Sequence, residues 1–184
     1  FALFLTLLAR MGDAPMAASQ AFISLLSISF MQAYGLGIGV STLVGQYIGA
    51  KDLAAAERSF YSGMRLCLCI AGIVGLLLVF ASEPLLRLYT DDPRVLALGR
   101  PLMLLGAVYQ VFDALAIIAD SGLRGAGDTR WPMMIRFFPS WLSFLPTAYI
   151  LGIYPDGRLT WAWGGGLLST LVLTSVLIGR VRPR

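Results

Sequence analysis

Uncharged stretches long enough to cross a bilayer alternate with short clusters of charged residues along the chain. The stretches 14–50, 66–82, 137–155 and 159–179 carry no charge, and 101–119 is uncharged except for one aspartate. A hydrocarbon core of about 30 Å requires about 20 apolar residues in a helix. The alternation typical of a membrane β-barrel is absent from the sequence. The pattern therefore predicts an all-α, polytopic transmembrane helix bundle that crosses the bilayer about five times.

The predicted spans follow this pattern. They cover 1–9 in part, 14–48, 60–82, 98–121, 133–152 and 160–179. Residues 1–9 have no initiator methionine, basic leader or small-residue cleavage site, so they do not resemble a signal peptide. We therefore expect the first helix to be truncated and the chain to be part of a longer protein.

The segment 14–50 is unusually long for one span. Its 37 residues would measure about 55 Å as a helix, which predicts one long helix that bends between Gly35 and Gly39. Gly35 and Gly39, like Gly45 and Gly49, have the small-xxx-small spacing that lets helices approach closely. We expect these glycines to pack against a neighbouring helix.

The composition agrees with a membrane protein. Hydrophobic residues make up 58% of the sequence and charged residues 13%, well outside the range of a soluble globular domain. The net charge of +4 comes from residues at the ends of the predicted spans, so it does not indicate nucleic-acid binding. Histidine is absent, and Cys67 and Cys69 point to different faces of one helix, so no zinc, haem or disulfide is expected. No phosphate-binding loop for ATP is present either, and we expect no cofactor.

The positive charges predict the orientation of the bundle. Nine lysines and arginines fall on one side of the predicted topology and five on the other. The nine are Lys51, Arg58, Arg65, Arg124, Arg130, Arg136, Arg180, Arg182 and Arg184. The side richer in these residues is expected to be cytoplasmic. The sequence thus predicts a multi-pass protein of the plasma (inner) membrane whose C-terminus lies in the cytoplasm.

Asp113 is an ionisable residue inside the predicted span 98–121. It lies about 20 Å along the helix from Arg100 and about 16 Å from Arg124, near the middle of the membrane. A carboxylate at that depth is costly and usually marks an ion or proton pathway. A carboxyl group that only hydrogen-bonds a neighbouring helix is the alternative interpretation.

A polar stripe surrounds this aspartate. Tyr109 precedes Asp113 by one turn, Gln110 adjoins it, and Asp120 lies two turns later. Asp120 is nearer the predicted cytoplasmic end, where a structural role is the better interpretation. Two oxygen ligands suit a hard monovalent cation, and a proton can compete with that cation for a desolvated carboxylate. Asp113 and Tyr109 are therefore predicted to couple to Na⁺ or H⁺, and no other metal site is expected.

The run Gly125-Ala126-Gly127-Asp128 fits the GxGD pattern of intramembrane aspartyl proteases. Those enzymes also need a Tyr-Asp pair on a preceding span, whereas Asp113 follows Phe112, and Asp128 falls in a basic loop. The run is better explained as a helix stop, a tight turn and an N-cap. No nucleophile, base or metal set points to an enzyme.

Four segments carry a family resemblance. They are GLGIGVSTLVGQYIGAKD at 35–52, AAAERSFYSGMRL at 54–66, YQVFDAL at 109–115 and LRGAGDTRWPMM at 123–134. Their order and spacing resemble the C-terminal half of transporters of the MATE (multidrug and toxic-compound extrusion) family. The resemblance implies that this chain is the second six-helix lobe of a twelve-helix protein, and that its partner is the missing N-terminal lobe.

The resemblance also implies an activity and a site. The family exchanges Na⁺ or H⁺ for small organic compounds, often cationic drugs, through a cavity that opens alternately to each side. In members that bind a cation in this lobe, a Tyr-x-x-x-Asp pair joins a glutamate from an earlier helix. Tyr109 and Asp113 match that pair, and the glutamate would precede Phe1. The residues expected at the substrate cavity are Gln32, Tyr34, Gln110 and Asp120.

A flippase of the same superfamily, which moves lipid-linked saccharides, is the alternative function. A long basic cavity would favour it, whereas the cavity candidates Gln32, Tyr34 and Gln110 are neutral. A purely structural membrane subunit is also compatible with the hydrophobic pattern but leaves Asp113 unexplained.

Overall fold

The computed structural model describes residues 12–130, 132–134 and 159–181 of the chain. Within these ranges it contains helices and no strand, which confirms the all-helical prediction. The helices are α2 (Asp13–Gly49), α3 (Leu53–Phe80), α4 (Ser82–Arg87), α5 (Pro93–Gly125) and α8 (Leu159–Val181). The predicted span 1–9 and most of the predicted span 133–152 lie outside the described residues.

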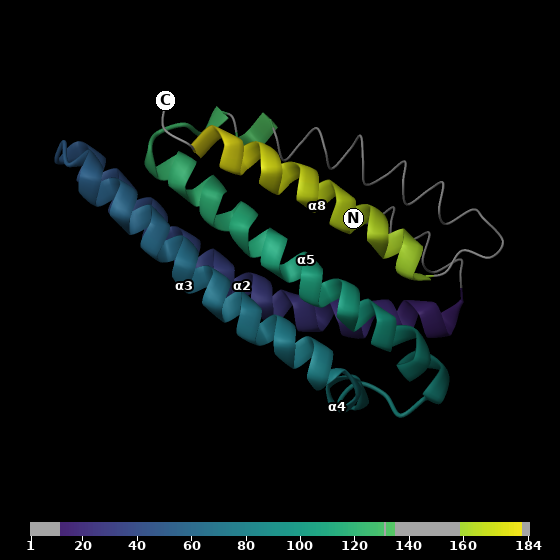
Figure 1. Ribbon diagram of the computed structural model, residues 1–184. Helices are drawn as coiled ribbons and strands as arrows, with labels where there is room; N and C mark the ends of the chain where they lie inside the picture. The colour runs from purple at the N-terminus through teal and green to yellow at the C-terminus, as the bar shows by residue number, and fades with distance from the viewer. Residues whose placement is uncertain (1–11, 131, 135–158, 182–184) are drawn as a thin grey trace.

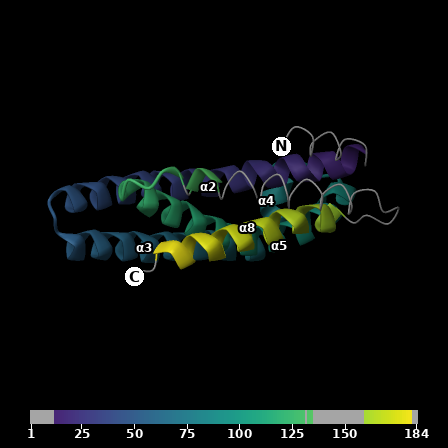
Figure 2. The same ribbon diagram turned by 90° about the horizontal axis from the view of Figure 1, so that it is seen from above.

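Helix α5 lies at the centre of this bundle and contacts the other four helices. Figure 1 shows it between α8 on one side and the pair α2 and α3 on the other. In Figures 1 and 2, α2, α5 and α8 run in the same direction and α3 runs back. The last turns of α2, α5 and α8 and the first turn of α3 therefore lie at one end of the bundle.

The outer surface of the bundle is apolar. Helices α2, α3 and α5 are each long and apolar enough to cross a membrane. Large apolar side chains are exposed along α3, namely Leu66, Ile73, Leu76, Leu77 and Phe80. A continuous exposed stripe of this kind is unfavourable in water and is expected where a helix faces lipid.

Aspartates define the starts of two long helices. Asp52 accepts a hydrogen bond from the Ala55 N–H at 2.9 Å, which caps α3. Asp92 accepts from the Arg94 N–H at 2.8 Å at the start of α5, where Pro93 occupies the first helical position. Both helices thus begin where a capping side chain meets an apolar run.

Helix α5 ends at the glycine-rich run that the sequence predicted as a stop. Gly127 has a φ of +86°, a left-handed conformation that favours glycine. Its N–H donates to the Arg124 carbonyl oxygen at 3.0 Å, and the Asp128 N–H donates to the Leu123 carbonyl oxygen at 3.0 Å. These bonds satisfy carbonyl groups at the helix end and turn the chain.

Helix α2 is one continuous helix of 37 residues. Among the described residues, Gly35, Gly39 and Gly49 pack against no neighbour, because a Cβ at any of these positions would meet no described atom within 4 Å. Gly37 faces α5 instead, where its Cβ would lie 2.5 Å from the Ser121 Oγ. Gly45 also lies against α5. The rotation of α2 about its own axis decides which glycines reach the interface.

Two clusters of buried apolar side chains join α2 to α5, and a third joins α5 to α8. The first joins positions 18–25 of α2 to positions 95–107 of α5. The second joins positions 33–44 of α2 to positions 114–118 of α5 and also includes Phe60 of α3. Polar positions of α2 and α5 lie between the first two clusters, and they form the site described next.

Candidate functional site

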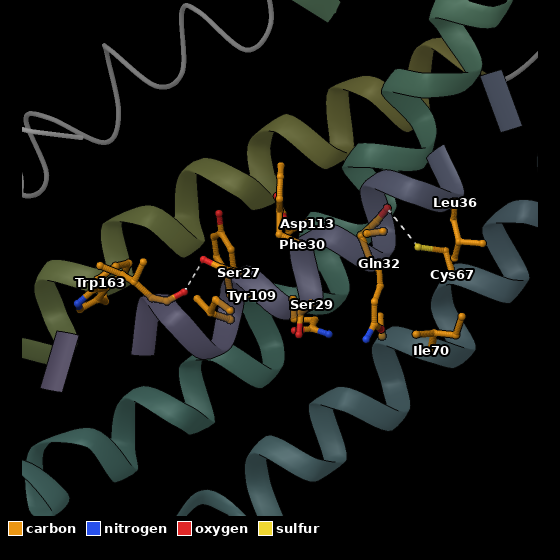
Figure 3. Close-up of a pocket in the computed structure, with 16 residues that line it drawn as sticks. Ser27, Ser29, Phe30, Gln32, Leu36, Cys67, Ile70, Tyr109, Asp113 and Trp163 are labelled. Atoms are coloured by element: carbon orange, nitrogen blue, oxygen red, sulfur yellow. Dashed lines mark hydrogen bonds between the residues drawn. The ribbon is translucent and has the colours of Figure 1, made fainter. Parts of the chain in front are cut away.

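A cavity of about 280 Å³ lies among α2, α3, α5 and α8. Figure 3 shows the side chains around it. The polar lining residues are Ser27, Ser29, Gln32, Cys67, Tyr109, Gln110 and Asp113. The larger apolar lining residues are Ile23, Leu26, Phe30, Leu36, Ile70 and Trp163. No lysine or arginine belongs to this described lining, so its charge comes from one carboxyl group.

Tyr109 and Asp113 both line the cavity, as Figure 3 shows. They stand one turn apart on α5, and both are partly buried. The helical spacing brings the phenol and the carboxyl group to the same face. A carboxylate that is partly removed from water attracts positive charge more strongly than an exposed one. The cavity therefore suits one positive charge, carried by a proton, a small cation or an organic molecule.

Aromatic side chains form part of the wall. Trp163 of α8 donates a hydrogen bond from its Nε1 to the Ser19 Oγ at 3.3 Å and meets the Phe22 ring edge to face, with centroids 4.9 Å apart. These contacts fix the indole between α8 and α2. Phe30 lines the same cavity from α2. Aromatic faces attract cations, so the wall complements the carboxyl group.

Of the four residues expected at the substrate cavity, two line the described cavity and two do not. Gln32 and Gln110 line the cavity. Tyr34 is exposed and stacks on Phe30, with ring centroids 5.9 Å apart, and it does not belong to the lining. Asp120 also lies outside the lining.

Asp120 has a different environment from Asp113. Its side chain is 1% exposed, and the Arg124 guanidinium one turn later donates a hydrogen bond to its Oδ2. The Arg124 side chain is 44% exposed, so the pair reaches from the buried helix interface toward the end of the bundle. Ion pairing within α5 and burial of the carboxyl group indicate a structural role for Asp120.

Sequence reasoning missed several lining residues. Ser29 and Cys67 lie on α2 and α3, and Trp163 lies on α8. A signal for Ser29 existed, since it stands three residues before Gln32 and thus shares its helix face. No comparable signal existed for Cys67 or Trp163, because their place beside Asp113 depends on how three separate helices pack.

The described residues contain no cluster of three His, Cys, Asp or Glu side chains that could bind a metal ion together. Tyr109 and Asp113 supply oxygen atoms alone. Oxygen ligands suit hard cations, and a single carboxyl group matches a monovalent charge.

Known proteins match this chain in sequence and in structure. A family model described as MatE matches residues 1–150. The chain is 31% identical over 188 residues to the probable multidrug resistance protein NorM of Thermotoga maritima, an alignment that covers 99% of this chain and 40% of that protein. It is 33% identical over 180 residues to the multidrug resistance protein NorM of Aliivibrio fischeri, covering 94% of this chain and 39% of that protein.

A crystal structure of MATE in the bent conformation superposes on the bundle with a TM-score of 0.84. The sequences are 18% identical, and the match covers 98% of this chain and 40% of that one. The fold is therefore shared with a solved membrane protein. The chain spans about 40% of the length of the curated relatives described above.

Proposed function

We propose, from the premise that this chain belongs to the MatE (MATE) family of membrane transporters, that it takes part in the export of small organic compounds, often cationic, in exchange for Na⁺ or H⁺. Membership of this family makes the chain part of a transporter and not of an enzyme. Since the chain matches about 40% of the length of its relatives, we also propose that it forms the C-terminal lobe of the transporter and packs against an N-terminal lobe.

The position of Asp113 in the cavity wall is the observation that carries this proposal. An ionisable group at membrane depth is expensive to keep and generally marks a transport pathway. Tyr109 stands beside it, and apolar and aromatic side chains form much of the remaining wall. This arrangement can hold either a small cation or a flat organic cation.

Exchange follows if the two kinds of cation compete for the same carboxylate. Binding of Na⁺ or H⁺ at Asp113 neutralises the charge that attracts the organic cation. If the two ligands favour opposite facings of the cavity, each shifts the same two-state equilibrium in the opposite direction. The inward flow of one cation then drives the outward movement of the other.

The helix directions support an orientation for this cycle. The predicted basic clusters around Lys51 and Arg124 lie near the end of α2 and the end of α5, which share one end of the bundle. By the positive-inside rule we place this end, and with it the C-terminus, in the cytoplasm. Homologues from bacteria support the plasma (inner) membrane as the location.

The flippase alternative is less well supported. A lipid-linked saccharide carries phosphate groups, which arginine and lysine bind best. The described lining has a carboxyl group, two amides and no basic side chain. We therefore retain organic cations as the substrate class.

The test replaces Asp113 in the complete transporter that contains this chain. We expect Asp113→Asn to abolish cation-coupled export while expression and membrane insertion are preserved, because the amide keeps the shape but cannot bind a cation by charge. Export is measured as drug accumulation in cells and as dye efflux from proteoliposomes with a Na⁺ or a pH gradient. Asp91→Asn, an exposed aspartate before α5, is the matched control and should export normally. Wild-type export by Asp113→Asn would overturn the proposal.

A further inference from the structure

Two buried oxygen atoms in the cavity wall have no hydrogen-bond partner among the described residues. They are the Ser29 Oγ on α2 and the Gln110 Oε1 on α5. Ser29 is 7% exposed and Gln110 is 6% exposed, and both residues line the cavity. Buried oxygens in folded proteins nearly always have a partner, because leaving one unsatisfied costs free energy. These two therefore indicate that something else donates to them.

Another hydroxyl group and a thiol group of the wall do have hydrogen-bond partners. The Ser27 Oγ donates to the Ile23 carbonyl oxygen at 2.8 Å, and the Cys67 Sγ lies 3.9 Å from the Ala114 carbonyl oxygen as a weak donor. An amide oxygen only accepts hydrogen bonds, and a hydroxyl oxygen also has acceptor lone pairs. Ser29 and Gln110 thus differ from these groups, because their oxygens are acceptors that no described group meets.

We infer that Ser29 and Gln110 form a recognition site for an N–H group of the transported compound, which selects protonated amines over quaternary ammonium ions. The inference rests on the proposed function, since it takes the cavity to be the substrate site. Asp113 attracts both kinds of cation by charge. Only a protonated amine also carries an N–H that can donate to one of the two acceptors or be shared between them, because a quaternary nitrogen has none.

The position of the two acceptors fits this role. They come from α2 and α5, which pack directly against each other, so a donor that enters between these helices meets both walls. Neighbouring atoms cover both oxygens in the structure. A donor therefore reaches them only after a local rearrangement, for which the long Gln110 side chain has the torsional freedom.

The probes are two cations that differ by one methyl group, benzyldimethylammonium, which has one N–H, and benzyltrimethylammonium, which has none. Binding of each to the complete transporter in lipid nanodiscs is measured by calorimetry. We expect the wild type to bind the N–H cation about tenfold more tightly, the value of one buried hydrogen bond. Gln110→Met should remove this preference and Ser29→Ala should reduce it, with the affinity for the quaternary cation unchanged.

Thr42→Val is the matched control, because it removes a hydroxyl from the same helix that donates to the Ile38 carbonyl oxygen and lies outside the cavity lining. It should keep the full preference. Ser29→Ala decides the question if Gln110→Met fails to fold, which thermal melting reports.

Three outcomes would overturn the inference. The first is equal affinity of the wild type for the two cations, which is expected if only water satisfies the oxygens. The second is a preference for the N–H cation that survives both substitutions. The third is no binding of either probe. The first two leave the proposed function standing, since the cavity still binds organic cations. The Asp113→Asn export assay judges the proposed function separately, so the two failures are distinguishable.

Discussion

The contact between α2 and α5 has two sections of opposite character. Toward the end of both helices the backbones nearly touch, since a Cβ on Gly37 would lie 2.5 Å from the Ser121 Oγ and one on Gly125 would lie 2.6 Å from the Ser41 carbonyl oxygen. One to two turns earlier the same helices enclose the cavity, where Ala33 lines the wall. We refer to these as the closed section and the cavity section.

The difference shows how a bundle keeps an open space at membrane depth. Close contacts lie on both sides of the cavity section, because the Phe22 ring packs on Gly106 before it and Ser121 packs on Gly37 after it. A helix is stiff over a few turns, so contacts at two points set the separation of the helices between them. Small side chains such as Ala33 do not fill that separation. The cavity therefore depends on glycines outside it.

The largest expected effect comes from breaking the closed section. In Gly125→Ala the new methyl group would meet the Ser41 backbone, with its carbonyl oxygen at 2.6 Å and its Cα at 3.1 Å, so neither atom can move aside as a flexible side chain would. We expect a loss of about 2 kcal/mol of stability, as is usual for overpacking. Unfolding of the purified protein by SDS titration measures it.

Gly39→Ala provides the control for that substitution. No described atom lies within 4 Å of its Cβ, and alanine favours a helix over glycine by about 1 kcal/mol. We expect unchanged or slightly raised stability. Equal losses for Gly125→Ala and Gly39→Ala would show that the close approach of α2 and α5 does not matter for stability.

A smaller effect is expected from the ion pair in the closed section. Arg124→Ala removes the guanidinium that donates to the Asp120 carboxylate. Because Asp120 is buried but Arg124 is half exposed, we expect a loss of about 1–2 kcal/mol, less than for a fully buried pair. Thermal melting in detergent measures it.

A double-mutant cycle sharpens this test. Asp120→Asn removes the charge that needs the guanidinium, so adding it to Arg124→Ala should recover part of the lost stability. Additive losses would show that Arg124 stabilises the bundle through packing of its alkyl chain alone. Arg65→Ala, an exposed arginine of α3, should leave the melting temperature unchanged.

The smallest effect on stability is expected in the cavity section. Ala33→Leu adds three carbons where the cavity of about 280 Å³ leaves room, whereas Gly125→Ala adds one carbon where there is none. We expect a change within about 1 kcal/mol in SDS titration. Binding of benzyltrimethylammonium should weaken, because the leucine takes up ligand volume. A loss as large as that of Gly125→Ala would contradict the comparison of the two sections.

Part of the candidate site was visible in the sequence. Tyr109 and Asp113 share one helix, so their four-residue spacing alone places them on one face. The same spacing argument grouped Asp120 with them, yet Asp120 lies outside the cavity lining and pairs with Arg124. Asp120 lies seven residues after Asp113, about 10 Å farther along the axis of α5 and past Ala114, the last α5 residue of the lining.

Residues from other helices were visible only in the structure. Tyr34 was a candidate for the substrate cavity, and in the structure it is exposed, stacks on Phe30 and lies outside the lining of the described cavity. Ser29 was not a candidate in the sequence and Cys67 was considered only for a disulfide or a metal, yet both line the wall. The face of α2 or α3 that meets α5 depends on the side chains of α5 as well. The sequence of one helix does not specify the side chains of its partner helix.

The sequence alone determined that helices form, that several are long enough to cross a membrane and where α5 stops, because these properties depend on local hydrogen bonding and on the apolar length needed in lipid. It also determined the Tyr109–Asp113 face. Only the tertiary structure decided that Gly37 and not Gly35 meets α5, and that Ser29 and Trp163 complete the wall around Asp113. The physical reason is that rotation and register of a helix are set by close packing between helices, which short-range sequence patterns do not encode.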